Sequence, residues 1–218
     1  VAEAVKKATG NGSYIVPTWL TPEREELIRE LKDHWLPPHL SRIHLTSGGS
    51  EANEAAMKIA VQYFAAKGQP NKSRIISRSL SYHGTTITTA GVSGHASRKR
   101  GLEAILTEYT SIETPYPLRC PLGQHHPDAA DYYIDNLMEV IDSEGAENIA
   151  ALIAEPINGS SGGAITPPEH YWPRVRKILK ENDILLIMDE VMTGFGRTGV
   201  RFGSELYGVE PDLLVAGK

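Results

Sequence analysis

Two side chains with reactive groups follow apolar segments in the last third of the chain. Asp189 closes the apolar run 184–188, and Lys218 comes directly after the run 213–217. Both runs have the length and composition of buried strands. Because neighbouring parallel strands end at the same edge of a sheet, where open α/β folds bind their ligands, we expect the carboxylate and the amine to face one ligand there.

An amine and a carboxylate in this arrangement suit pyridoxal phosphate chemistry. The amine of Lys218 could form a Schiff base with the aldehyde of this cofactor, and the carboxylate of Asp189 could keep a proton on the pyridine nitrogen. A protonated ring withdraws electrons from a bound substrate. Such a cofactor also needs a site for its phosphate and a surface for its flat ring.

The segment 46–54, TSGGSEANE, is a candidate phosphate site. It lies between a predicted strand and a predicted helix, so its glycines, its free backbone N–H groups, the Ser50 hydroxyl and the positive end of the helix dipole would converge on one point. The same segment is also typical of an ordinary tight turn with Ser50 as the helix N-cap. It lacks the Gly-Lys-Ser/Thr ending of a Walker loop and the spacing of a dinucleotide fingerprint.

Three further motifs follow predicted strands. Tyr82, in the sequence Tyr-His-Gly, could stack on a flat heterocycle, although an aromatic residue after a strand is also typical of a core. Glu155 ends another apolar run, and a carboxylate at a buried strand end must be paired, solvated or hydrogen-bonded. Two such carboxylates, Glu155 and Asp189, favour a site over a single helix cap. The glycine-rich turn 194–199 is most simply a tight loop.

Composition and charge narrow the function classes. A net charge of −5 and a pI near 5.9 offer no basic surface for nucleic acid. The longest strictly apolar run is far shorter than the roughly 18 residues that a membrane span needs, and we find no signal-like segment. We therefore expect a cytoplasmic protein, and the single cysteine, Cys120, which cannot form an internal disulfide, agrees with a reducing compartment. Cys120, His125 and His126 lack the spacing of a recognised metal site, and we expect no metal.

Helical and strand-like segments alternate, which predicts a parallel sheet covered by helices on both faces. The expected helices cover 1–8, 21–35, 52–64 and 131–143, and a further one starts at 167–168 although Pro173 interrupts its first turn. The expected strands cover 42–46, 74–77, 150–154, 184–190 and 213–217. The segment that begins near Tyr82 and the stretch 115–131 are expected to be loops. The chain begins without Met and stops directly after a strand, so we expect a fragment.

Taken together, these motifs resemble the class III aminotransferases. They follow the family's order along nearly the whole chain: SGGSEANE at 47–54, Tyr-His-Gly at 82–84, Ala-Glu-Pro at 154–156, DEVMTGFGRTG at 189–199, Pro-Asp at 211–212, and Lys218. The string at 189–199 followed by a lysine is the most specific of them. The resemblance implies the large domain of a fold-type I pyridoxal-phosphate-dependent transferase, a mainly parallel sheet in an α/β/α sandwich. Residues 1–40 would lead into it, and residues 41–218 would form the cofactor-binding domain, truncated after the lysine.

The resemblance also implies how a cofactor is held. Gly49 and Ser50 would bind its phosphate. Tyr82 would stack on one face of the pyridine ring, Val191 would pack on the opposite face, and His83 would line the site close to the ring. The same residues therefore account for both ends of the cofactor.

Three more roles follow from the resemblance. Asp189 would form a salt bridge with the pyridinium nitrogen, and Glu155 would help to fix Asp189 or the substrate side of the pocket. Lys218 would be the Schiff-base lysine and, once displaced by the substrate amine, the base that moves a proton between substrate and cofactor carbons. Neighbouring groups and desolvation would have to lower the pKa of this lysine for it to act near neutral pH.

The activity implied is transfer of an amino group from an amine or ω-amino acid to a 2-oxo acid, in a homodimer with sites at the subunit interface. We expect the isolated chain to have weak or no turnover, because segments that complete such a site are missing. A decarboxylase or an aminomutase of the same fold would share all of these motifs. From a different class, a non-catalytic partner or scaffold is the remaining alternative, but it would have no need of a reactive amine opposite a carboxylate.

Overall fold

The computed structural model describes residues 1–12, 14–16 and 19–218, and its internal packing divides them into two units, Val1–Ile43 and His44–Lys218. The first unit contains α1 (Ala2–Asn11), α2 (Pro22–Glu30) and a short π-helix (Leu31–Trp35) that continues α2. The side chain of Thr21 caps α2 by accepting a hydrogen bond from the backbone N–H of Arg24 at 3.3 Å. Pro22 stands at the first helical position, where its missing N–H costs nothing, as the sequence predicts.

A five-stranded, wholly parallel sheet forms the centre of the second unit. Its strands are β1 (Arg74–Arg78), β2 (Ser111–Ile112), β3 (Ile149–Ala154), β4 (Leu185–Asp189) and β5 (Leu213–Val215). They lie in the order β2-β1-β3-β4-β5, so the chain runs outward from β1 in one direction and then in the other. An open parallel sheet with this reversal of order binds ligands beyond the carboxyl ends of its strands.

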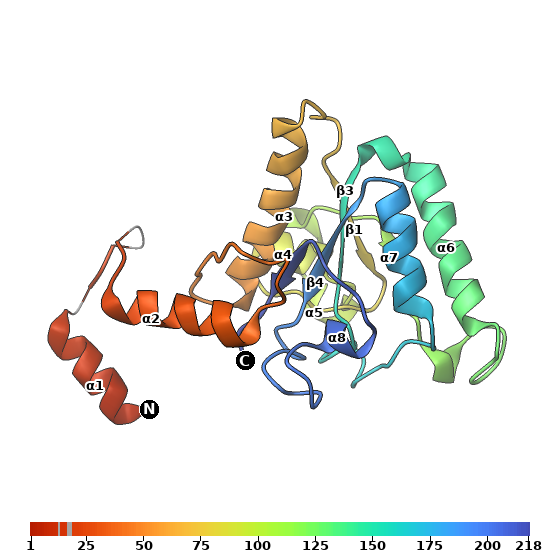
Figure 1. Cartoon of the computed structure of the whole chain (residues 1–218). Helices are drawn as coiled ribbons and strands as arrows, with labels where there is room; N and C mark the ends of the chain where they lie inside the picture. Colours follow the sequence, from red (N-terminus) through yellow and green to blue (C-terminus); the bar gives the residue numbers. More distant parts are fainter. Residues whose placement is uncertain (13, 17–18) are drawn as a thin grey trace. The chain divides into compact units, whose positions relative to one another are not determined.

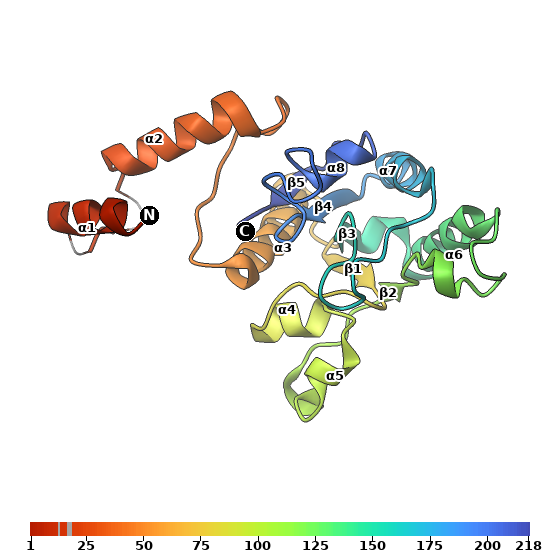
Figure 2. The same ribbon diagram turned by 90° about the horizontal axis from the view of Figure 1, so that it is seen from below.

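Helices cover both faces of the sheet, which gives the three layers visible in Figures 1 and 2. One face carries α3 (Gly49–Ala66) and α4 (Ile87–Val92), and the other carries α6 (Ala129–Glu144) and α7 (Tyr171–Glu181). Successive strand residues alternate between the two layers: Ile75 packs toward α3 and Ile76 toward α6 and α7. Each fully buried side chain of this size stabilises the fold by roughly 1.5–3 kcal/mol. The predicted α/β/α sandwich is confirmed.

Shorter helical turns lie in the connections. They are α5 (Ala96–Lys99), α8 (Gly203–Leu206) and three turns of 3₁₀-helix at Glu103–Ile105, Pro117–Arg119 and Ala146–Asn148. Among the described residues, no helix is both long enough and apolar enough to cross a bilayer.

Three local predictions are wrong. Residues 42–46 do not form a strand, because an extended run joins a sheet only where it finds a partner, and the two edges of this sheet are β2 and β5. The helix expected from 167–168 begins instead at Tyr171. Pro173 then lies in its first turn, where a helix does not use the backbone N–H that proline lacks. The loop expected after Tyr82 contains α4, which its β-branched residues conceal, and α5, which is a single helical turn.

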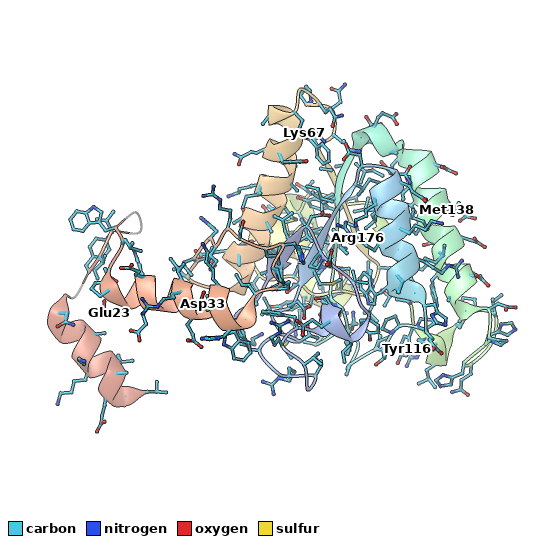
Figure 3. The ribbon with its side chains drawn as sticks, viewed as in Figure 1. Glu23, Asp33, Lys67, Tyr116, Met138 and Arg176 are labelled. Atoms are coloured by element: carbon cyan, nitrogen blue, oxygen red, sulfur yellow. The ribbon has the colours of Figure 1, made fainter. Side chains whose placement is uncertain are left out.

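A partly buried ion pair fixes the strand that leads to Lys218. Arg176, labelled on α7 in Figure 3, donates two hydrogen bonds of 2.6 and 2.8 Å to the carboxylate of Asp212. The same carboxylate accepts the backbone N–H of Leu186 at 2.8 Å. Because Asp212 directly precedes β5 and Leu186 lies in β4, this contact sets the level at which β5 ends beside β4.

Candidate active site

A cavity of about 450 Å³ opens at the carboxyl edge of the sheet. Its walls come from the start of α3 and from the segments that follow β1, β3, β4 and β5. All eight residues predicted from the sequence line it: Gly49, Ser50, Tyr82, His83, Glu155, Asp189, Val191 and Lys218. Tertiary structure thus brings together residues from five separate parts of the chain.

Of the two residues with which the sequence analysis began, Asp189 ends β4 and Lys218 follows the adjacent strand β5. In the register of the parallel pair, Asp189 is opposite Val215, three residues before Lys218. Asp189 is only 4% exposed, whereas Lys218 is exposed and its Nζ contacts the Sδ of Met192 at 3.4 Å. The carboxylate is therefore fixed in the floor of the cavity by its hydrogen bonds.

Hydrogen bonds hold the carboxylate of Asp189 from several sides. Its Oδ2 accepts from Nδ2 of Asn53 and from Nδ1 of His83, both at 2.8 Å. Its Oδ1 accepts the backbone N–H of Val191 at 3.1 Å. A carboxylate can only accept, so Nδ1 of His83 carries the hydrogen. Oδ1, which takes only one of these three donors, retains the capacity to accept another hydrogen bond.

Two buried polar atoms next to this carboxylate have no hydrogen-bond partner within the described part of the chain. They are Nε2 of His83 and Oδ1 of Asn53. An unpaired polar atom in the interior is costly, and buried groups of this kind are generally satisfied by a ligand, water or protein. They therefore mark the inner end of the cavity as a place built for a polar ligand.

The opposite end of the cavity offers donors for an anion. Helix α3 is 18 residues long, and its N-cap is Gly48 rather than Ser50, so the alternative of Ser50 as N-cap does not hold. The Ser50 Oγ instead accepts the backbone N–H of Thr85 at 3.1 Å. A Cβ on Gly84 would lie 2.5 Å from that oxygen, so only glycine lets this loop approach the start of α3 so closely. Free N–H groups and the helix dipole at this end favour a phosphate.

Glu155 links two of the loops that form the walls. Its Oε1 accepts the backbone N–H of Gly159 at 2.9 Å, and its Oε2 accepts the backbone N–H of Tyr82 at 3.3 Å. Desolvation by burial raises the pKa of Glu155, and the negative charge of Asp189 adds to this increase, while His83 opposes it. The carboxylate of Glu155 thus holds the backbone of Tyr82 in place.

Tyr82 lines both the main cavity and a smaller one of about 110 Å³. The guanidinium of Arg98 lies over its ring, 4.2 Å from the centroid, and lines only the smaller cavity. A cation over an aromatic face contributes about 0.5–1 kcal/mol at an exposed position. The ring of Tyr82 is therefore supported by a residue that lines the smaller cavity.

Sequence reasoning missed two polar residues of this region. Asn53, which binds Asp189, stands in the apolar stripe of α3, one turn after Gly49, and a polar residue in a buried stripe is the signal that could have indicated it. Glu190 is fully buried and accepts hydrogen bonds from Thr193 and from the backbone N–H groups of Gly203 and Ser204. Glu190 thus joins the glycine-rich turn to α8, and no local sequence pattern distinguishes Glu190 from an ordinary acidic residue.

Comparisons with known proteins agree with this geometry. A family model described as aminotransferase class-III matches residues 1–218. The chain is 40% identical over 194 residues to a probable gamma-aminobutyrate transaminase 4 of Oryza sativa subsp. japonica, covering 88% of this chain and 40% of that protein. It is 36% identical over 221 residues to the aminotransferase YodT of Bacillus subtilis, covering 100% of this chain and 49% of YodT.

Solved structures give the same result. A thermostable (S)-enantioselective omega-transaminase from Thermomicrobium roseum superposes with a TM-score of 0.90 at 38% identity, over 99% of this chain and 48% of that one. An amine transaminase from an uncultivated Pseudomonas species, in a PLP-bound form, superposes with a TM-score of 0.86 at 37% identity, over 93% of this chain and 46% of that one. The chain thus spans less than half the length of each of these relatives.

Proposed function

The chain belongs to the class-III aminotransferase family, and we propose that its cavity binds pyridoxal phosphate in a transaminase that moves an amino group from an amine or ω-amino acid to a 2-oxo acid. One observation carries this proposal: Asp189 ends β4, Lys218 follows the adjacent parallel strand β5, and both line the same cavity as the start of α3. Relatives named as a gamma-aminobutyrate transaminase and as an omega-transaminase support the donor class.

The residues present fit this cofactor. The free N–H groups at the start of α3 and the hydroxyl of Ser50 would take the phosphate. Tyr82 and Val191 would take the two faces of the ring. Oδ1 of Asp189, with its remaining acceptor capacity, would take the protonated pyridine nitrogen. The unpartnered Nε2 of His83 provides a further polar contact at that end of the site.

When bound, pyridoxal phosphate supplies an electron sink for charge that develops on the substrate carbon. We assign to Nζ of Lys218 the covalent attachment of the cofactor and, after a substrate amine has displaced it, proton transfer at the carbon that bears the amino group. A positioned base of this kind contributes about 10²–10⁴-fold to a rate. The hydrogen bonds of Asp189 keep the carboxylate still.

A decarboxylase or an aminomutase would use the same residues, and the transaminase is preferred because the named relatives are transaminases. A non-catalytic scaffold would not need the hydrogen bonds that hold Asp189 beside an open cavity.

We further propose a homodimer located in the cytoplasm. No residue of α1 or α2 is buried, and their exposed apolar side chains, such as Val5 and Leu27, support an additional contact surface in the complete protein. Light scattering would report a monomer if this proposal is wrong. Some relatives are named as mitochondrial, so cell fractionation decides the location.

The decisive experiment is chemical trapping in the complete protein. Pyridoxal phosphate is added, borohydride reduces the covalent adduct, and peptide mass mapping locates it. We expect the label on Lys218, its loss in Lys218→Ala and its retention in Lys99→Ala, which removes a lysine of the smaller cavity. Labelling that is unchanged in Lys218→Ala would refute the proposal. Donor amines can then be screened against pyruvate and 2-oxoglutarate, and the isolated chain 1–218 should show little or no turnover.

A further inference from the structure

Asn53 is a buried polar residue for which the proposed function gives no role. It lies in the second turn of α3 and is 1% exposed. The rest of the stripe that α3 turns toward the sheet is apolar and contains Ala56, Met57, Ala60 and Phe64. An amide in such a stripe is retained at a cost in stability unless its hydrogen bonds are made.

The hydrogen bonds of Asn53 point to a specific task. Its Nδ2 donates to the backbone carbonyl of His83 and to Oδ2 of Asp189, both at 2.8 Å. Both neighbours are pure acceptors, so the opposite orientation of the amide would set its Oδ1 against a carbonyl and a carboxylate. The orientation is therefore determined by the surroundings, and the amide acts as a double donor.

We propose that Asn53 is a positioning residue that holds Asp189 as an oriented anion for the cofactor. Together with His83 it anchors Oδ2, so that Oδ1 keeps its acceptor capacity. By binding the carbonyl of His83, it also joins α3, which starts at the phosphate end, to the loop after β1. This inference rests on the proposed function, because it assigns Asn53 a role toward the same cofactor.

The first test is a double-mutant cycle on the affinity for pyridoxal phosphate, measured in the complete protein. A hydrogen bond to a charged group is lost in Asn53→Ala, which should weaken binding about 10- to 100-fold. In an Asp189→Asn background the same change should have an effect of less than about threefold, since the anion it serves is gone. A residue that only packs would give the same loss in both backgrounds.

Asn182→Ala is the matched control for this cycle. Asn182 is half-buried, and its Nδ2 donates to the carbonyl of Ile178 at 2.9 Å near the end of α7. It does not line the cavity. Its loss should lower stability without changing the affinity for the cofactor.

The second test needs no cofactor. Asn53→Asp keeps the shape of the side chain but places a second carboxylate against Asp189, and two facing carboxylates share a proton, so the pKa of the pair is raised. The melting temperature of the cofactor-free variant should therefore fall furthest below wild type at alkaline pH and recover as the pH falls. His83, Glu155 and Lys218 also face this carboxylate, but they are common to both proteins.

The outcomes separate the two proposals. If the wild-type protein does not bind pyridoxal phosphate, the proposed function fails. If the wild type binds but Asn53→Ala binds within twofold of it, or if the thermal penalty of Asn53→Asp is the same at all pH values, the role of Asn53 is overturned. Asn53→Ser, which keeps one donor, should bind more tightly than Asn53→Ala, and equal affinities would also contradict the inference.

Discussion

Replacing Gly84 with alanine tests whether its loop packs against α3 and α4 as closely as the structure shows. Gly84 has a φ of +143°, which an L-residue adopts only with strain of about 1–3 kcal/mol. Its added Cβ would lie 2.5 Å from Oγ of Ser50 and 2.6 Å from Oγ1 of Thr89. Overpacking of this kind costs about 1–3 kcal/mol more. We therefore expect Gly84→Ala to lower the free energy of unfolding by about 2–6 kcal/mol, out of about 5–15 for a typical domain.

Gly123 provides the matched control. Its φ of +126° is similar, but an added Cβ would find only Cδ2 of His126, at 3.9 Å. Gly123→Ala should therefore show the backbone strain alone, about 1–3 kcal/mol. Urea denaturation of the cofactor-free proteins measures both values. Titration with pyridoxal phosphate should show weaker binding only in Gly84→Ala, because displacement of Ser50 disturbs the proposed phosphate site. Equal losses of stability in the two variants, or unchanged cofactor affinity in Gly84→Ala, would refute this reasoning.

Two further predictions concern buried carboxylates. Glu190→Gln places an NH₂ group against backbone donors and should lower the free energy of unfolding, measured by urea denaturation, by about 2–3 kcal/mol. The control Glu205→Gln affects a surface ion pair with Arg201 and should cost at most about 1 kcal/mol. Similar costs in the two variants would contradict the role of Glu190 as a buried hydrogen-bond acceptor. Burial raises the folded-state pKa of Glu155, so its ionised form destabilises the fold at neutral pH and this penalty disappears as the pH falls through that pKa. The stability difference between Glu155→Gln and wild type should therefore shift in favour of wild type on acidification, and a constant difference would exclude this.

Part of the fold could be read from local patterns. Thr21 and Pro22 predict the start of α2, and the apolar spacing after residue 52 predicts α3, because caps and periodicity act over a few residues. Local patterns gave wrong predictions where the structure of a segment depends on which other segment it packs against. The run 42–46 has strand-like residues but no neighbouring strand, and Pro173 lies inside a helix because its place in the first turn removes the usual penalty.

The candidate site shows the same division. Glycines, a reactive lysine and carboxylates at the ends of apolar runs can be identified one by one, since their chemistry belongs to the residue. The residues that these groups contact cannot be identified in this way. Asn53 is 136 residues from Asp189, and Arg98 supports Tyr82 only because the segment after α4 folds back over that ring.

By itself, the sequence determined which groups could react and that they follow strands, because residue type and apolar periodicity are local properties. Only the tertiary structure decided that these strands are adjacent, that β5 ends level with β4 through Arg176 and Asp212, and that an amide from α3 binds Asp189. The physical reason is that strand order and helix packing minimise the exposed apolar surface of the whole chain, and no short segment contains that information.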